Sequence, residues 1–419
     1  GESSSILSGD QSLVLNIQDT MTLATLSEIN SETLTVNGTS ATTLDENSLI
    51  NTSVLDWNGT KLVISNSASI SVNDRNPGET TGAGKPNASN ISGNGGNHGG
   101  VGSRGFSSAD NETSYYGSAL EPATAGSNGG STNAGAGGGG GGIIRIQLSD
   151  TLTLNGQISS NGGNGLNGYN SRGGGGGAGG SIWVNTETLS GEGVFQANGG
   201  SGGGGTNYRG GGGSGGRIAV YYNAWADFVS PESSQVSGGA GRYTAGAAGT
   251  LVFIDQKNSS DSSDDHIWVK EAWRWQANDA PFNFNSFIAY PGTLISGPNE
   301  ADMVLSFEEF TLENGALWYP DEHATELSAD TLILSDSSKI LSDEKSLVLN
   351  INSDLTLSAQ TEIDCDTLTV NGASVTTIHE GSQISTDILN WNGTDLAIES
   401  TASIDVSGRN PGESTGTGK

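Results

Sequence analysis

Residues 12–30 read SLVLNIQDTMTLATLSEIN, and residues 33–51 read TLTVNGTSATTLDENSLIN. Each stretch holds three short apolar alternations separated by Asn, Gly, Ser or Asp, and alternation with a period of two predicts β-strands. When the first stretch is laid over the second, aliphatic side chains coincide position by position. The coinciding pairs are Leu13 with Leu34, Leu23 with Leu44, and Ile29 with Ile50. The same pattern continues through Leu55 and Ile70.

Three strands in each such step, with like residues at each step, are typical of a parallel β-helix, or solenoid. In that fold each coil would place its inward Leu, Ile or Val about 4.8 Å from the same residue of the next coil. A β-sandwich is the alternative, because its strands also alternate. A sandwich, however, has no reason to keep one step length at three separate positions. We therefore expect an all-β parallel β-helix with coils of about 21 residues.

The chain also repeats over a longer distance. Residues 1–85 match residues 335–419 without a gap, and roughly half of the positions are identical. We therefore expect the chain to span about one and a quarter units of a tandem array. Cys365 faces a serine and His379 faces an aspartate in the other copy, so neither is kept as a candidate site residue.

Glycine dominates the middle of the chain, with 66 glycines among 419 residues. Strand-like runs follow Gly-Gly or Gly-Thr and contain Ile144, Ile182, Ile218 and Val252 at corresponding places. Each interval between them exceeds the expected coil by roughly 15 residues, the length of one loop insertion. We therefore expect the glycine runs to leave one corner of successive coils and to return there, where glycine permits tight re-entry.

The arrangement of these runs has two interpretations. Side by side, glycine chains can pack as extended polyglycine-II-like helices with three residues per turn, because no side chain blocks close approach. The alternative is a set of mobile linkers. The runs concerned are Gly135–Gly142, Gly173–Gly180 and Gly202–Gly216.

The middle segment resembles the glycine-rich modules of giant secreted or cell-surface microbial repeat proteins. The resemblance rests on GGGGGGIIRI, GGSIWV, LSGEGVFQANGGSG and GGGGSGGRIAVYY, taken in that order, and covers about residues 66–255, with a return at 400–419. It implies a right-handed parallel β-helix of adhesin or fibre type in an extracellular or cell-surface protein. It brings no catalytic residues with it.

Four segments follow from these patterns. Residues 1–85 are expected to form β-helix coils, 86–255 a glycine-rich β-helix module, 256–330 an aromatic-rich junction, and 331–419 the coils of the next repeat. We expect the rhythm of the coils to break over 256–330. In the junction, Trp268, Trp273 and Trp275 have three interpretations: a cap or joint between β-helix stretches, a subunit contact, or a glycan-stacking surface.

The charge excludes one class of function. The chain carries 46 acidic and 16 basic residues and a formal net charge of −30. Nucleic acid binding needs clustered Lys and Arg, so we expect no nucleic acid partner. No apolar run approaches the roughly 20 residues of a membrane-spanning helix. A single cysteine excludes an internal disulfide.

Metal binding and glycosylation each have one candidate set. Asp261, Asp264 and Asp265 are a weak Ca²⁺ candidate, because Ca²⁺ takes six to eight oxygen ligands, but their spacing matches no EF-hand. No other cofactor is expected. Asn58 and Asn392 keep an N-x-Thr sequon in both copies of the repeat and are candidates for N-glycosylation.

The expected function is structural rather than enzymatic. Polysaccharide lyases also use parallel β-helices, but they need clustered carboxylates and a Lys or Arg base. Lysine is scarce here, and Arg75 and its copy Arg409 lie in Pro-Gly turns. We therefore expect a repeat unit of a giant extracellular filament or fibre whose partner is itself. The alternative is a cell-surface adhesin that binds glycans or a protein.

Overall fold

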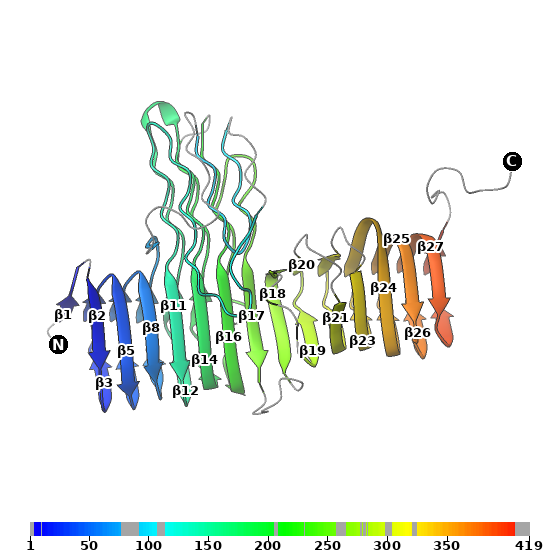
Figure 1. The fold of residues 1–419 in the computed structure, drawn as a ribbon, viewed down its shortest axis with the longest axis horizontal. Coiled ribbons are helices and arrows are strands. Elements are labelled where there is room, and N and C mark those ends of the chain that lie inside the picture. Colours follow the sequence, from blue (N-terminus) through cyan, green and yellow to red (C-terminus); the bar gives the residue numbers. More distant parts are fainter. Residues whose placement is uncertain are drawn as a thin grey trace. The chain divides into compact units, whose positions relative to one another are not determined.

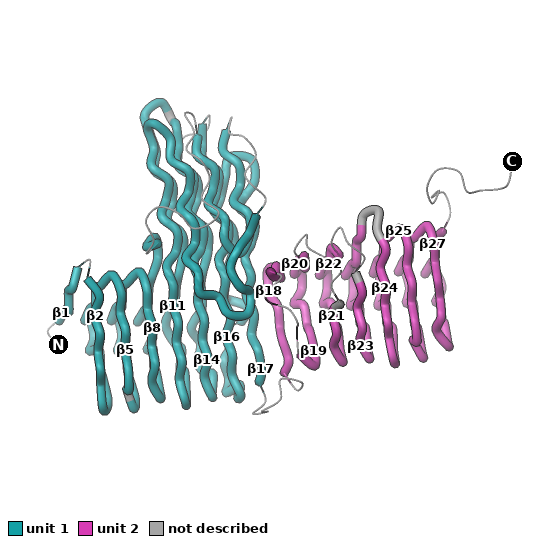
Figure 2. The backbone as a smooth tube through the Cα atoms, viewed as in Figure 1, with its two compact units in different colours: residues 1–257 teal, residues 258–419 magenta. Residues whose placement is uncertain are grey.

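The computed structural model describes the chain as two units, Gly1–Lys257 and Asn258–Lys419 (Figure 2). The division falls just after the expected end of the glycine-rich module. The described residues are 4–9, 11–76, 92–106, 114–204, 208–229, 231–256, 265–276, 279, 282, 284–297, 304–320 and 325–406.

Regular structure in the described residues is strand, apart from the 3₁₀ turn η1 (Tyr169–Ser171) and the 3₁₀ residue Asp279 (Figure 1). The strands of the first unit are β1 (Ser5–Leu7), β2 (Ser12–Asn16), β3 (Thr20–Leu23), β4 (Glu28–Asn30), β5 (Thr33–Thr39), β6 (Ala41–Leu44), β7 (Leu49–Asn51), β8 (Val54–Gly59), β9 (Leu62–Ile64), β10 (Ser69–Ser71), β11 (Ile143–Leu148), β12 (Thr151–Leu154), β13 (Gln157–Ser159), β14 (Ser181–Ser190), β15 (Val194–Gln196), β16 (Arg217–Ala226) and β17 (Thr250–Asp255). Those of the second unit are β18 (His266–Arg274), β19 (Ser286–Ala289), β20 (Leu294–Ser296), β21 (Val304–Leu312), β22 (Leu317–Tyr319), β23 (Thr325–Leu334), β24 (Lys339–Leu357), β25 (Glu362–Asn371), β26 (Val375–Ile378), β27 (Gln383–Asn392), β28 (Asp395–Ile398) and β29 (Ser403–Asp405).

Strands of the first unit pair in three parallel ladders, and each ladder stacks one column of apolar side chains. The first column is Leu13, Leu34, Leu55, Ile144, Ile182, Ile218 and Leu251. The second is Leu23, Leu44, Ile64 and Leu154. The third is Ile6, Ile29, Ile50, Ile70, Ile158 and Phe195. Most of these side chains are fully buried, so the expected columns of like residues are confirmed.

One register expectation is wrong. Ile218 pairs with Leu251, not with Val252, which pairs instead with Ala219. Every residue of β17 from Thr250 to Ile254 is buried, so the run has no polar alternation to fix its register in the sequence.

The glycine-rich segments all leave the ladders at one place. Each follows a strand of the third ladder or its bridge and ends at a strand of the first ladder: 72–142 between β10 and β11, 160–180 between β13 and β14, 197–216 between β15 and β16, and 237–249 before β17. In Figure 1 their described parts extend away from the strands and run alongside one another. The expectation of insertions at one corner is therefore confirmed.

The second unit also forms three parallel ladders, and its aromatic-rich part belongs to them. One column runs Trp273, Ile295, Trp318, Ile340, Ile363, Ile384 and Ile404. Another runs Leu305, Leu327, Leu349, Val370 and Trp391. Strands β18–β22 therefore keep the three-strand pattern, and the expected break in rhythm over 256–330 does not appear in them.

A left-handed residue recurs at one turn of successive three-strand sets. In the first unit the positions are Leu26, Asn47 and Ser67, with φ between 60° and 62°. In the second they are Gly292, Gly315, Ser337, Gln360, Gly381 and Thr401. The N–H of the residue after each turn in the first unit bonds the carbonyl three residues earlier, as from Ser27 to Ala24 at 3.0 Å. A positive φ at the third residue of such a turn favours glycine, yet the chain uses several L-residues there.

Candidate functional site

The glycine bundle, defined as the described residues of 92–142, 160–180, 197–216 and 236–249, is the candidate functional region. Its central segment is Gly173–Gly180. Every third N–H of this segment points to the same neighbour, with N–H to O=C distances of 2.8–3.0 Å. Gly173, Gly176 and Gly179 donate to 208–214; Gly174, Gly177 and Gly180 donate to 160–166; Gly175 and Ala178 donate to 127–130.

The carbonyl groups of the same segment accept bonds from three further neighbours. Gly93 and Gly96 donate to Gly173 and Gly176, Gly138 and Gly141 donate to Gly175 and Ala178, and Gly203 and Gly200 donate to Gly174 and Gly177. The central segment is thus bonded on all sides, to six described segments. The period of three is what an extended chain with three residues per turn produces. Hydrogen bonds between segments therefore replace the internal hydrogen bonds that a single extended segment of this kind lacks.

Glycine is required inside this bundle because no space exists for a side chain. A Cβ added to any of the seven glycines between 173 and 180 would lie 1.7–2.1 Å from a backbone oxygen of a neighbouring segment. Real Cβ atoms essentially never approach closer than 3.0 Å. Ala178 alone carries a Cβ there, and it is fully buried.

Asparagine side chains extend the bonding between neighbouring segments. The side-chain oxygens of Asn161, Asn164 and Asn167 accept backbone N–H bonds from Asn198, Ser201 and Gly204, respectively. Each pair is 37 residues apart, and the three pairs are spaced by three residues. The run NGGNGLN at 161–167 carries this period in the sequence, so the signal was available, although no expectation rested on it.

A buried polar cluster joins the bundle to the first ladder. The imidazole Nδ1 of His98 lies 2.7 Å from the carbonyl of Gly179, and its Nε2 lies 3.0 Å from the hydroxyl of Thr124. Because a carbonyl only accepts, Nδ1 carries the hydrogen and Nε2 accepts. Burial, and then the nearby Arg217, lower the pKa of His98 to about 3, so the imidazole is neutral at pH 7.

The other members of this cluster are also held tightly. The Arg217 guanidinium donates from Nε to the carbonyl of Tyr116 at 2.8 Å and from Nη1 to the Thr250 hydroxyl at 3.2 Å. Burial raises the pKa of Tyr116 to about 12, and its hydroxyl donates to the Ala125 carbonyl at 2.7 Å. We interpret the cluster as a structural joint, because the hydrogen bonds given above all run to backbone carbonyls or hydroxyls of the same unit.

The tryptophan candidates are divided between interior and surface. Trp273 and Trp275 are 2% and 4% exposed and pack with Phe282, while Trp268 is half-buried. A small apolar cavity lies among Trp273, Trp275, Phe282 and neighbouring aromatic residues. A buried indole ring cannot stack on a glycan. Trp273 and Trp275 therefore pack in the interior of the second unit.

The calcium candidate falls mostly outside the described residues, which include neither Asp261 nor Asp264. Asp265 is buried. Among the described residues no group of three or more His, Cys, Asp or Glu side chains could hold a metal ion.

The glycosylation candidates belong to asparagine ladders. Asn58 Nδ2 donates to Asn37, which donates to Asn16; the second copy of the repeat has the same three rungs, Asn392 to Asn371 to Asn350. A glycan on Asn58 or Asn392 would be attached to the nitrogen that makes these bonds. The structure therefore assigns both amides a role within the fold, whether or not a glycan is present.

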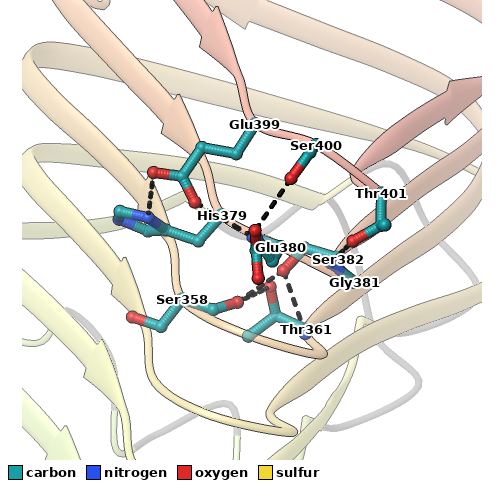
Figure 3. Close-up of polar contacts among 9 residues, drawn as sticks. All are labelled: Ser358, Thr361, His379, Glu380, Gly381, Ser382, Glu399, Ser400 and Thr401. Atoms are coloured by element: carbon teal, nitrogen blue, oxygen red, sulfur yellow. Dashed lines mark hydrogen bonds and ion pairs between the residues drawn. The ribbon is translucent and has the colours of Figure 1, made fainter.

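One exposed cluster braces successive turns of the second unit (Figure 3). His379 Nδ1 lies 3.0 Å from Glu399, and the Ser400 hydroxyl donates to Glu380 at 2.8 Å. The Gly381 N–H donates to the Thr401 hydroxyl at 3.1 Å. These bonds all run from one turn to the next, which is consistent with setting His379 aside as a candidate.

Buried Cys365 has a matching environment. Its thiol lies 4.0 Å from the hydroxyl of Thr386, as the hydroxyl of Ser31 lies 3.4 Å from that of Thr52 in the other copy. The two residues occupy equivalent places, and serine serves there equally well.

No helix in the described part of the chain has the length and apolar character that crossing a membrane would need. Comparisons with protein-family models, with curated proteins and with solved structures found no match to this chain.

Proposed function

We propose that the chain is a structural repeat segment of an extracellular or cell-surface filament, built as a parallel β-helix with a polyglycine-II-like flange. The observation that carries the proposal is the recurrence of the same ladder in both copies of the long repeat. Leu13, Leu34 and Leu55 stack in the first copy, and Leu347, Leu368 and Leu389 stack in the second. When each repeat contacts only its neighbours, an added copy of the repeat can lengthen the stack through the same contacts.

The chemistry of the surface supports a mechanical role. Strand faces that do not point to a column carry Thr, Ser, Asn and Asp, and the net charge of −30 keeps separate stacks apart in water. The resemblance to giant microbial repeat modules favours an extracellular location. The proposal includes no catalysis, because no constellation of acid, base and nucleophile has been identified in the described residues.

Electron microscopy of tandem chains tests the proposal. A chain carrying two copies of residues 1–334 followed by 335–419 is compared with the chain described above. We expect straight rods whose length increases by a constant increment for each added copy, with the glycine bundle as a lateral projection that recurs once per copy. Globular particles, or beads joined by bent linkers, would overturn it.

The adhesin alternative needs an exposed contact surface for a glycan or a protein. The aromatic side chains proposed for glycan contact include Trp273 and Trp275, which are buried. Trp268 is half-buried, so a glycan-binding role would rest on Trp268 or on another surface, for which the far end of the glycine bundle is our candidate.

A further inference from the structure

The glycine bundle ends in a set of loops that are bonded to one another. The Gly173 N–H donates to the Tyr208 carbonyl at 3.0 Å, which links the loop around Tyr169 to that around Tyr208. Arg209 Nε donates to the Gly202 carbonyl at 3.2 Å, and its carbonyl accepts from the Phe106 N–H at 3.4 Å. These contacts connect the described parts of the loops at the end of the bundle that lies away from the strands, here called the distal surface (Figure 1).

This distal surface presents three arginines in a regular series. The intervals between Arg172, Arg209 and Arg242 are close to those between the stacked Ile182, Ile218 and Leu251. The arginines therefore belong to successive insertions. All three side chains are half-buried rather than enclosed, which leaves part of each accessible to a ligand.

Aromatic rings accompany the arginines. The series Tyr169, Tyr208 and Tyr243 is 81%, 37% and 61% exposed. The Arg242 guanidinium lies 5.7 Å from the ring centres of Tyr243 and Phe106, and Phe106 meets Tyr208 edge to face at 5.2 Å. Exposed tyrosines beside ordered guanidinium groups present both a flat apolar face and a directed charge.

The charge of the three later segments of the bundle is opposite to that of the chain. Residues 160–180, 197–216 and 236–249 contain no Asp or Glu, although the chain as a whole has a net charge of −30. None of the ion pairs among the described residues involves Arg172, Arg209 or Arg242. The first segment of the bundle contains Arg104 and Glu121 among the described residues, and Asp110 and Glu112 outside them.

We propose that this distal surface binds an anionic polysaccharide whose sugar residues carry carboxylates. Residues 92–249 contain six arginines and no lysine. The planar guanidinium fork matches a carboxylate in a two-point contact, which the point charge of lysine does not. The tyrosine rings lie under the apolar faces of the sugar rings. A regular series of arginines fits a polymer that repeats its charge, and this inference does not depend on filament formation.

The test uses the full chain and immobilised polygalacturonate, with dextran as the neutral control. The variant Arg172→Gln/Arg209→Gln/Arg242→Gln is expected to bind about tenfold or more weakly. A charge-matched variant, Arg145→Gln/Lys61→Gln/Lys339→Gln, removes three positive charges outside the bundle and is expected to bind as the unchanged chain does. Because Arg209 bonds two backbone carbonyls, Arg172→Gln/Arg242→Gln serves as a second tip variant.

A tyrosine variant separates stacking from charge. Tyr169→Ser/Tyr243→Ser is expected to weaken binding while leaving its dependence on salt concentration unchanged, since the arginines remain. Hydrogen exchange of the glycine amides checks that the bundle is intact in each variant.

Four results would overturn the proposal. They are equal binding by the tip variants and the unchanged chain, an equal loss in the charge-matched variant, binding of dextran as strong as that of polygalacturonate, and a change in sedimentation of the tip variant with no polysaccharide present. The last would show that the surface contacts the acidic face of a second copy of this chain.

Discussion

The ladders and the glycine bundle of the first unit solve the same problem with opposite chemistry. In the ladders, the strands are paired through their backbones, and aliphatic side chains such as Leu34 and Leu55 stack in a buried column that excludes water. In the bundle, Gly176 and its neighbours have no side chain, and backbone groups bond directly to backbone groups on all sides. Burial of apolar side chains stabilises the ladders. Hydrogen bonds between closely packed backbones, which only glycine allows to approach, stabilise the bundle.

The difference predicts different tolerance to substitution. A ladder position needs an apolar side chain of about the right size, and the columns indeed exchange Leu, Ile, Val, Phe and Trp from one set to the next. A central glycine of the bundle accepts nothing larger than hydrogen, since a Cβ would meet backbone that cannot move aside, and within 173–180 only position 178 has room for a Cβ. The ladders should therefore vary among aliphatic residues while the centre of the bundle stays glycine.

The largest expected effect comes from adding side chains to the centre of the bundle. In Gly176→Ala/Gly177→Ala each new Cβ would lie 1.9 Å from a backbone oxygen of Gly200 or Gly139. We expect a loss of about 4 kcal/mol or more in the stability of the bundle. Hydrogen exchange, followed by mass spectrometry, should show faster exchange of the bundle amides while the amides of β2–β9 stay protected. Ala178→Gly is the matched control, and unchanged protection in the double variant would contradict the prediction.

Removing one side chain from a ladder tests the other half of the comparison. Leu34 is fully buried between Leu13 and Leu55, and Leu34→Ala leaves a cavity in that column. The expected loss is about 3 kcal/mol in the free energy of unfolding of the first unit. Chemical denaturation provides the measurement, with Leu34→Ile as the volume-conserving control. A loss below about 1 kcal/mol would mean that the columns do not carry the fold.

The joint between the two regions should make stability depend on pH. His98 has a folded pKa of about 3 and an ordinary unfolded pKa near 6.5, so below pH 6.5 the unfolded chain binds a proton that the folded chain does not. The stabilising contribution of neutral His98 is therefore complete above pH 6.5 and is lost as the pH falls toward 3. We expect a loss of about 1 kcal/mol between pH 6 and pH 5.

Replacement of the histidine isolates this effect. His98→Gln keeps a side-chain amide near Gly179 and Thr124 but cannot bind a proton in this range. Denaturation measured at pH 7, 6 and 5 should show a smaller fall in the variant than in the unchanged chain. Identical pH profiles would show that other groups, such as the many carboxylates, account for the whole dependence.

Sequence patterns predicted the two regions to different extents. The constant step between coils located the columns of β2–β10, because side-chain alternation is a direct record of which face is buried. The register at Leu251 was missed because β17 is buried throughout and its sequence has no alternation. The aromatic columns were missed because Trp273 and Trp318 replace aliphatic residues there, and a concentration of aromatic residues was interpreted as a break in the pattern.

The bundle shows what local sequence does not contain. A run of glycine permits both a linker and a packed helix, and the difference depends on neighbours far away in the chain. Asn161, Asn164 and Asn167 carried the period of three that distinguishes the two. Arg172, Arg209 and Arg242 carried the interval between insertions. The asparagine period and the arginine interval can be recognised only when the successive glycine-rich insertions are aligned with one another.

The smallest expected effect concerns the left-handed turn that recurs along the ladders. Leu26 adopts φ 62° and is 57% exposed, so its side chain contributes little packing to offset a strained backbone. Leu26→Gly should raise the free energy of unfolding by about 0.5–1 kcal/mol, because glycine adopts this conformation without steric cost. Gly315 occupies the equivalent turn of the second unit with φ 75° and open space around it, so Gly315→Ala should lower stability by a similar amount. Thermal denaturation of both variants measures the two shifts. Shifts of the same sign would mean that side-chain contacts, rather than backbone conformation, decide what these turns accept.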